Sequence, residues 1–328
     1  MPCFLGADLG GTKTHLVIAD ETGRVLGFGE SGPANHQSVG YGGMFQALET
    51  ALGLATAAAD VSVSAIRSAV FGVAGYDWPS QKPAMLQTIE RLGMQAPFTI
   101  VNDAISGLVA GSEEGWGVSV VSGTGCNCRG WDRYHKREGR VTGFGSLVGE
   151  AAGATEIIYR AMQLIAFAWT KRGPATSLSN AFVAAAGARG VEDLLEGYTT
   201  GRYRVPGEAA PVIFQHADAG DAVAAGLVEW AGVELGEMAN AVIRQLELEP
   251  AAFDVVLAGS MFEGGPRLIE PMRRTIHKTA AKARLVRLTV PSVAGAVLLA
   301  MIEADLKPDA GLRGVLAESL RGVRRTAG

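Results

Sequence analysis

The stretch LGADLGGTKT, Leu5–Thr14, lies close to the start of the chain and decides which fold to expect. An apolar, strand-like run ends at Asp8, and Gly10, Gly11 and Thr12 separate it from a second strand-like run. This pattern predicts a tight β-hairpin whose backbone N–H groups point at a phosphate, because a Cβ at the glycines would block a close approach. Asp8, at the strand end, is predicted to hold Mg²⁺ through water, as an oxygen ligand for a hard cation.

The composition indicates a globular protein with room for two domains. The 328 residues are 48% hydrophobic and 19% charged, with a formal net charge of −4 and no block of like charges, so no nucleic-acid surface is predicted. The chain has no run of about eighteen apolar residues and no signal-peptide pattern, so we expect a cytoplasmic protein without a membrane partner. Three cysteines, an odd number, favour free thiols over a disulfide framework.

The order of predicted elements repeats along the chain. The first part shows three strands, a helix over 41–59, a strand, a helix from Pro79 to about Leu92, the strand FTIVND and a short helix AISGLVAG. A second set has the strands GVSVVSGTG, CRGWD and RVTGFG, and later FDVVLAGS, a helix, RLVRLTV and a last helix. We therefore predict two related halves that meet across a hinge near residues 111–116, with an all-helical insertion at about 151–249.

A second glycine turn occupies the equivalent place in the second half. In VVSGTGCN, an apolar strand runs into Gly123, Thr124 and Gly125. Two matching hairpins together predict a nucleotide held between the halves. In VVLAGSMFEGG, a strand ends before Gly259 and Ser260, where a flat base such as adenine has access to exposed backbone. Ordinary structural turns are the alternative at all three places.

Asp103 is the candidate catalytic residue. In FTIVNDAISG it follows a buried strand and begins a helix, where the helix N-terminus and Asn102 orient its carboxylate. Phosphoryl transfer needs a group that orients the acceptor hydroxyl and takes its proton, and an aspartate within hydrogen-bond reach supplies both. Aspartate is also a preferred helix N-cap, which is the purely structural alternative.

In this order, the motifs resemble those of the N-acetylglucosamine kinase and BadF/BadG/BcrA/BcrD ATPase family, within the superfamily of actin-like proteins, sugar kinases and Hsp70 ATPases. The resemblance covers nearly the whole chain and is carried by GADLGGTKT, VNDA, VSGTGCN, VVLAGSMF and PSVAGAVLLA. It implies an α/β fold of two ribonuclease-H-like domains, the actin-like ATPase fold, around a central cleft that closes over ATP and a sugar. The expected domains are residues 1–112 and 113–305, with the helical insertion in the second and a C-terminal helix, about 306–328, packing back on the first.

The resemblance also implies roles for individual residues. Asp103 matches the catalytic base of the family's sugar kinases. The residues that match ATP contacts are Gly10, Gly11, Thr12, Lys13, Ser122, Gly123, Thr124, Gly125, Gly259 and Ser260. Those that match sugar contacts are Asn35, His36, Asn102, Asp103, Gly143, Phe144 and Glu150. Without the resemblance, Asn35 and His36 would be read as part of a polar loop.

The chain departs from the family at one motif. Where N-acetylglucosamine kinases carry a pattern like GWGxxxGDEGSA, this chain reads GFGSLVGEAAGA, so Phe144 replaces tryptophan and Glu150 replaces aspartate. Glu150 is one methylene longer, which moves its polar contact by about 1 Å. Either it accepts hydrogen bonds from sugar hydroxyls or it is the first-turn acid of the helix that opens the insertion. The identity of the sugar therefore stays open.

The predicted function is transfer of the γ-phosphoryl group of MgATP to the 6-hydroxyl of an amino sugar, N-acetylglucosamine or glucosamine, with ATP and Mg²⁺ as cofactors. Domain closure is expected to exclude water from the reaction. The alternative is a non-catalytic or ATPase-type relative that binds nucleotide or glycan, or activates another enzyme. An activator with an iron–sulfur cluster is disfavoured, because only Cys126 and Cys128 lie near each other. Family resemblance implies a homodimer.

Overall fold

The computed structural model describes residues 2–326 and contains two five-stranded sheets with the orders β3-β2-β1-β4-β5 and β10-β9-β6-β7-β8. Read from β8, the second order repeats the first, so the predicted α/β fold with two related halves is confirmed. The strands of the first sheet are β1 (Cys3–Leu9), β2 (Thr14–Asp20), β3 (Val25–Ser31), β4 (Ile66–Val73) and β5 (Phe98–Asn102). Those of the second are β6 (Gly117–Ser122), β7 (Cys126–Trp131), β8 (Glu138–Arg140), β9 (Asp254–Ala258) and β10 (Arg284–Arg287).

The first sheet and the helices that cover it form what we call the first domain. β1 pairs antiparallel with β2 and parallel with β4, and it is buried on both faces, as its apolar sequence requires. α1 (His36–Ala59) and α2 (Lys82–Glu90) cover one face. α1 begins at His36, before the predicted residue 41, because Asn35 caps it and because the helix continues through a break at Gly40, where φ is 67°.

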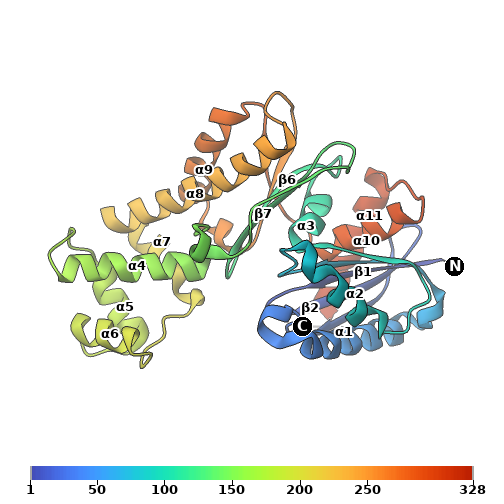
Figure 1. The fold of residues 1–328 in the computed structure, drawn as a ribbon, viewed down its shortest axis with the longest axis horizontal. Helices are drawn as coiled ribbons and strands as arrows, with labels where there is room; N and C mark the ends of the chain where they lie inside the picture. Colours follow the sequence, from blue (N-terminus) through green and yellow to red (C-terminus); the bar gives the residue numbers. More distant parts are fainter. Residues whose placement is uncertain (1, 327–328) are drawn as a thin grey trace.

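The second sheet and the helices packed on it form the second domain. Its helices are α4 (Ala154–Trp169), α5 (Leu178–Ala186), α6 (Val191–Thr199), α7 (Ala210–Asp218), α8 (Ala222–Leu246) and α9 (Pro266–Thr279). The insertion is helical, as predicted, and α4–α7 form a lobe at the left of Figure 1 while α8 runs from this lobe to the sheet. The predicted strand RVTGFG was wrong: β8 ends at Arg140, because the chain turns away at Gly143 and Gly145, where φ is 77° and 63°.

Helices α3 (Asp103–Gly111), α10 (Val293–Glu303) and α11 (Ala310–Thr326) connect the two domains. α10 is apolar on all sides and packs on β1, β4 and α3, although the sequence-based division counted its residues with the second domain. A Cβ at Gly295 would lie 1.9 Å from the Ser106 carbonyl oxygen, so glycine permits the close contact between α10 and α3. α11 lies beside β3, where the Val25 N–H donates to Ser319 Oγ at 3.0 Å.

The remaining helical segments are short 3₁₀ helices at Val63–Ala65, Pro79–Gln81, Gly145–Val148, Gly207–Ala209 and Ser260–Gly264. Among residues 2–326, no helix combines the length and the apolar composition that crossing a bilayer requires.

Candidate active site

The first glycine turn joins β1 to β2 and stands open. The Gly10 N–H donates to the Lys13 carbonyl at 2.9 Å, and a Cβ on Gly11 would meet no atom within 4 Å. Thr12 is exposed, and Lys13 Nζ lies 2.7 Å from the carboxylate of Glu30 on β3. The backbone of this turn is therefore accessible to a ligand, while its lysine already has an acidic partner.

The second glycine turn joins β6 to β7 and is bound to the start of α4. The carbonyls of Gly123 and Thr124 accept hydrogen bonds from the N–H groups of Ala154 and Thr155 at 2.8 and 3.0 Å. Thr124 and Gly125 are nevertheless exposed. The turn thus presents its tip outward while its base is held by a helix.

The third turn, at the end of β9, touches the second. A Cβ at Gly259 would lie 2.2 Å from the carbonyl oxygen of Ser122, and Gly259 has a φ of 107°, so glycine is needed for two reasons. The Ser122 hydroxyl is buried and donates to the Ala152 carbonyl at 2.7 Å, so its side chain supports the turn from within the protein. The second phosphate segment therefore meets the predicted adenine segment, which includes Ser260, where β6 and β9 end.

Asp103 lies where the first sheet meets the second. Asn102 is the N-cap of α3, with its Oδ1 accepting the Ala104 N–H at 3.0 Å, and Asp103 Oδ1 accepts the same N–H at 3.0 Å from the first turn. The same Asn102 Oδ1 accepts a hydrogen bond from Asn127 Nδ2 at 3.0 Å. Because Asn127 lies in β7, just after the second glycine turn, this bond places Asp103 beside the strand that leaves that turn.

Two carboxyl groups share this poorly solvated place. Burial, and then the charge of Asp103, raises the pKa of Asp8 to about 7. Burial raises the pKa of Asp103 to about 6, the Ala104 N–H and Arg129 oppose this rise, and Asp77 adds to it. Raised carboxyl pKa values caused by burial and by a like charge are typical of active sites.

Asn35 and His36 lie at the start of α1. Asn35 Oδ1 accepts the Gln37 N–H at 2.9 Å, so this side chain has a structural contact besides the predicted role in sugar binding. The His36 ring stacks on Tyr41 with centroids 5.0 Å apart, and burial lowers the pKa of His36, which favours the neutral ring. Its Nδ1 is buried and has no hydrogen-bond partner within the described part of the chain. A ligand hydroxyl is the kind of group that would satisfy it.

Glu150 holds the loop that carries Gly143 and Phe144. Its Oε1 accepts hydrogen bonds from the Thr142 N–H at 2.6 Å and the Thr142 hydroxyl at 2.8 Å, and its Oε2 accepts the Gly143 N–H at 2.7 Å. The alternative of a first-turn acid was wrong, because α4 begins only at Ala154 and Glu156 occupies its first turn. Glu150 therefore acts on the loop, and Phe144 on that loop lies 6.1 Å from Trp78 of the first domain, measured between ring centroids.

Two residues of this region, Asp77 and Arg129, were not found from the sequence. Both are buried, and Arg129 Nη2 lies 3.4 Å from Asp77 Oδ1. For Arg129 the available signal was the alternation in CNCRGW. It places the polar Asn127 and Arg129 on one face of β7 and Cys126 and Cys128 on the other.

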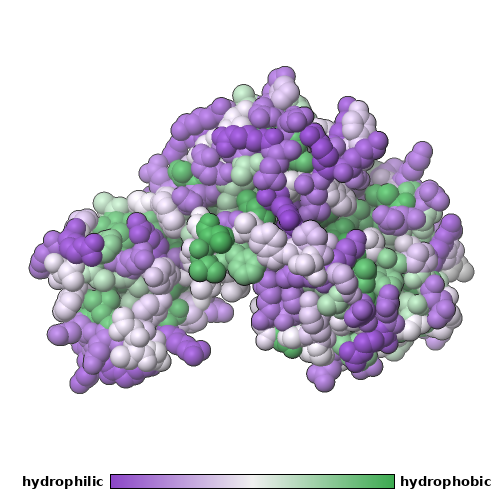
Figure 2. Space-filling model, in the orientation of Figure 1, coloured by the Kyte–Doolittle hydropathy of each residue, from purple (hydrophilic) through white to green (hydrophobic). Residues whose placement is uncertain are grey.

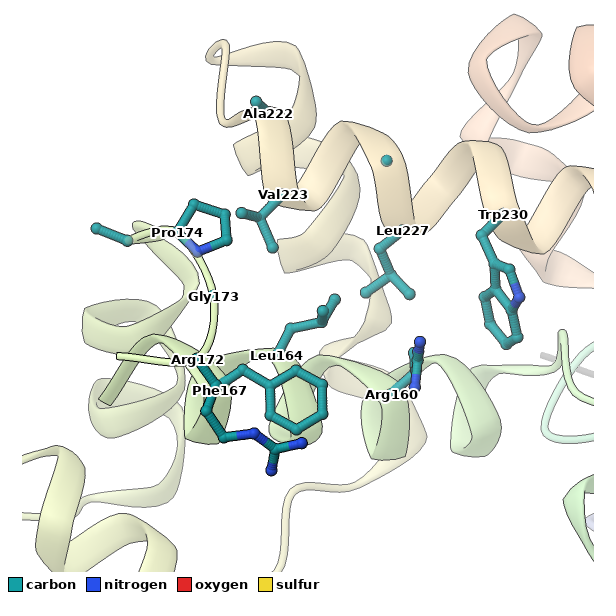
Figure 3. Close-up of a pocket in the computed structure, with 12 residues that line it drawn as sticks. Arg160, Leu164, Phe167, Arg172, Gly173, Pro174, Ala222, Val223, Leu227 and Trp230 are labelled. Carbon is teal, nitrogen blue, oxygen red and sulfur yellow. The ribbon is translucent and has the colours of Figure 1, made fainter. Parts of the chain in front are cut away.

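Among the pockets of the second domain, two have the same volume and differ in their distance from the predicted adenine segment. One, of about 530 Å³, is lined by Gly207, Glu208, Phe214, Gln215, Ser260 and Glu263 and so adjoins the third turn. The other, also about 530 Å³, lies between α4 and α8 (Figure 3) and is lined by Arg160, Leu164, Phe167, Leu227 and Trp230; neither Asp8 nor Asp103 lines it. Only the first of these adjoins the predicted adenine segment.

In the space-filling view the molecule is notched between the helical lobe and the first domain, with apolar surface at the edge of the notch (Figure 2). Phe144, Leu147 and Val148 are exposed in the segment that precedes α4. Apolar side chains at the rim of a cleft are typical of surfaces that contact a ligand or close over it.

The cysteines do not form a metal site. Cys126 and Cys128 are buried in the core of the second domain, and burial raises the pKa of Cys126 to about 12. Within residues 2–326 no cluster of three or more His, Cys, Asp or Glu side chains is arranged to bind a metal ion. Any metal bound at Asp8 would therefore complete its shell with water or ligand oxygens.

Comparison with known proteins adds to this geometry. The sequence profile of the BadF/BadG/BcrA/BcrD ATPase family matches residues 5–300. An N-acetyl-D-glucosamine kinase of Dictyostelium discoideum is 27% identical over 311 residues, which cover 91% of this chain and 97% of that protein. An N-acetylmuramic acid/N-acetylglucosamine kinase of Clostridium acetobutylicum is 26% identical over 307 residues, covering 93% and 100%. A Chromobacterium violaceum protein, solved as a candidate N-acetylglucosamine kinase, shares the fold with a TM-score of 0.66 at 23% identity, over 91% of this chain and 99% of that one.

Proposed function

Because the chain belongs to the BadF/BadG/BcrA/BcrD ATPase family, we propose that it is an ATP-dependent sugar kinase that phosphorylates the 6-hydroxyl of N-acetylglucosamine or glucosamine. Two relatives that match over nearly their whole length are N-acetylglucosamine kinases by name, which supports this substrate class. The observation that carries the proposal is the position of Asp103, which lies between the two domains in the first turn of α3, directly after the N-cap Asn102.

In this proposal Asp103 orients the acceptor hydroxyl and takes its proton. Its pKa, raised by burial to about 6, leaves the carboxylate ionised at neutral pH and makes it a stronger base than a solvated aspartate. The metaphosphate-like transition state of phosphoryl transfer needs little covalent help, so correct placement of the hydroxyl contributes most.

Asp8 is the residue proposed to hold Mg²⁺. The chemistry of the site fits this ion, because the Asp8 carboxylate is an oxygen donor beside a second carboxylate, Asp103, whose charge, after burial, raises the pKa of Asp8. Mg²⁺ typically binds one or two carboxylates and keeps water and phosphate oxygens as its other ligands. When bound, it would neutralise charge on the phosphate oxygens.

The nucleotide is proposed to lie along the edge of the second sheet. The exposed backbone at Thr124 and Gly125 suits phosphates, and the pocket that adjoins Ser260 suits the base. Gly11 and Thr12 of the first turn supply further N–H groups to the phosphates. In this proposal the site consists of residues of one chain, and the homodimer expected from the family contributes no residue to it.

The test is a coupled assay of MgATP-dependent phosphorylation with a panel of N-acetylglucosamine, glucosamine, N-acetylmuramic acid and glucose. We expect turnover with the first two and a fall in kcat of at least about 100-fold in Asp103→Asn. Carbon–phosphorus coupling at C6 of the product, measured by NMR, checks the position. Asp221→Asn is the matched control, because Asp221 caps α8 with bonds of 2.9 Å to the Val223 and Ala224 N–H groups, and Asn retains the cap.

Two results would refute the proposal. No turnover with any sugar, together with tight MgATP binding, would favour the non-catalytic alternative. Wild-type turnover in Asp103→Asn would mean that Asp103 is not the catalytic base, and the kinase activity would then depend on other groups.

A further inference from the structure

A buried ion pair joins the two domains next to Asp103. Among the residues whose burial is described, Arg129 is the one buried arginine or lysine. From β7 its Nη2 donates to the Tyr76 carbonyl at 3.0 Å and lies 3.4 Å from Asp77 Oδ1, and both partners belong to the loop after β4 in the first domain. Its Nη1 donates to Glu138 of β8 at 3.0 Å. Arg129 thus fastens the first domain to the second.

Asp77 is held from three further sides. Its Oδ2 accepts a hydrogen bond from Gln37 Nε2 of α1 at 2.8 Å, and its carbonyl accepts one from Arg140 Nη1 at 2.7 Å. A Cβ at Gly143 would lie 2.6 Å from Asp77 Oδ1, so the loop that carries Phe144 packs directly on this carboxylate. Asp77 therefore contacts both segments that are predicted to bind the sugar, the start of α1 and the 143–144 loop.

The ion pair is poorly explained by stability alone. Arg129 Nε is buried and has no hydrogen-bond partner within residues 2–326, and burial raises the pKa of Asp77 despite the nearby guanidinium. Buried pairs with incomplete hydrogen bonding are commonly no more stabilising than apolar residues of similar volume. What the pair does supply is a fixed geometry between two domains that must close on a substrate.

The inference rests on the proposed function and names a residue for it. We propose that Arg129 is a positioning residue for the sugar: by holding Asp77 across the domain interface, it fixes the start of α1 and the 143–144 loop relative to Asp103. The pair belongs to the acceptor side of the cleft. Breaking it should therefore impair use of the sugar while leaving nucleotide binding nearly unchanged.

The experiment compares Arg129→Met, Asp77→Asn and the double variant. Arg129→Met leaves the buried Asp77 carboxylate without its ionic partner, and Asp77→Asn leaves Arg129 with Glu138 as its one acidic partner among the described residues, so we expect both to lower the melting temperature, and the double variant to recover most of it. Sugar kcat/KM should stay at least about 10-fold below wild type in the double variant, because a misplacement of about 1 Å is felt strongly in catalysis. The MgATP dissociation constant should change by less than about twofold, within the scatter of such contacts.

Two further variants separate position from stability. Arg129→Lys keeps the charge and loses the second guanidinium nitrogen, which lets Arg129 bind Glu138 and the 76–77 loop at once, so it should fold like wild type and show a sugar kcat/KM between wild type and the double variant. The control pair is Arg284→Met with Asp254→Asn, which removes an ion pair of 2.8 Å within the second domain that also has one buried carboxylate. We expect this control to lower the melting temperature without changing sugar KM.

One outcome overturns the inference: a double variant that recovers the melting temperature and whose sugar kcat/KM also returns to within about twofold of wild type. If the wild type phosphorylates no sugar, the proposed function fails before any variant is compared. Hydrogen–deuterium exchange then still tests Arg129. Residues 74–81 and 140–148 should lose protection together in the double variant and in neither member of the control pair, and loss in one segment alone would refute the coupling.

Discussion

The two glycine turns occupy matching places in two similar sheets, yet their surroundings differ. A Cβ at Gly11 in the first turn would meet no atom within 4 Å, whereas one at Gly153, which packs on the second turn, would lie 2.4 Å from the Gly125 carbonyl carbon. The carbonyls of the second turn are hydrogen-bonded to the start of α4, and that turn also contacts Gly259. The first turn has its own hairpin bond and the Ala34 N–H, which donates to Gly10 at 3.1 Å.

The comparison shows that the same strand–glycine–strand pattern can form a well-supported turn in one domain and a weakly supported one in the other. The second turn is hydrogen-bonded to the start of α4 and packs against Gly259 at the end of β9, so its backbone is held on two sides. The first turn is loosely supported and carries the acidic Asp8 beside it, where the second half of the chain has Val121. We infer that the second turn positions the phosphates and that the first turn adapts to them and brings the metal ligand.

The largest expected effect comes from crowding the second turn. Gly153→Ala should lower the free energy of unfolding by about 3 kcal/mol, because the new methyl group overlaps backbone atoms of Gly125 that cannot move independently. Gly153 has a φ of −86°, which alanine adopts freely, so the loss reports the contact rather than backbone strain. Chemical denaturation measures it. Gly53→Ala in α1, where a Cβ would meet no atom within 4 Å, is the matched control and should not destabilise.

The next effect concerns the charge beside the first turn. The folded pKa of Asp8, about 7, lies above the value of 3.8 expected in the unfolded chain, so the folded state binds more protons between these values and stability falls as pH rises through this window. Asp8→Asn should therefore raise the free energy of unfolding by about 2 kcal/mol at pH 8 and change it little at pH 3.5. The measurement is denaturation at both pH values without Mg²⁺.

Asp221 provides the opposite case. Although burial acts against it, hydrogen bonds from Ser177, the Ala224 N–H and Thr176 lower the pKa of Asp221 to about 2. Its charge therefore stabilises the folded state above about pH 4, and this contribution is lost as pH falls towards 2. Asp221→Ala should reduce stability at pH 7, and equal pH profiles for the Asp8 and Asp221 variants would contradict the assignment of opposite shifts.

The sequence predicted the repeated α/β halves, the three glycine turns and the place of Asp103 between a strand and a helix, because each depends on local sequence: an apolar run, a glycine and a carboxylate at a strand end. It could not show that Asn102 takes over the helix cap, since the competing capping contact becomes visible only with coordinates. Asp77 and Arg129 were missed for a different reason. They lie 52 positions apart and become partners only when the two domains meet. Glu150 was assigned to sugar binding from the family resemblance. Its hydrogen bonds to Thr142 and Gly143 depend on how the loop folds back, which the sequence does not show.

A smaller effect distinguishes ligand contact from support in the first turn. Gly11→Ala should leave the free energy of unfolding within about 0.5 kcal/mol of wild type, because the added methyl group points into open space. If phosphates approach this backbone, the same methyl group should weaken MgATP binding about 10-fold, or about 1.4 kcal/mol. Isothermal titration calorimetry measures the affinity. Unchanged affinity would mean that the first turn stays away from the phosphates.

The smallest expected effect tests whether Lys13 leaves Glu30 for the nucleotide. The pair is exposed, so breaking it should change the free energy of unfolding by at most about 0.5 kcal/mol. If Lys13 contacts phosphate, Lys13→Met should weaken MgATP binding a few-fold and Glu30→Gln should strengthen it, because the ammonium group then has no competing carboxylate. Salt should reduce both changes, since the groups are solvated. Equal MgATP affinities in the two variants would mean that Lys13 pairs with Glu30 and does not contact the nucleotide. Any nucleotide contact in the first turn would then come from the backbone.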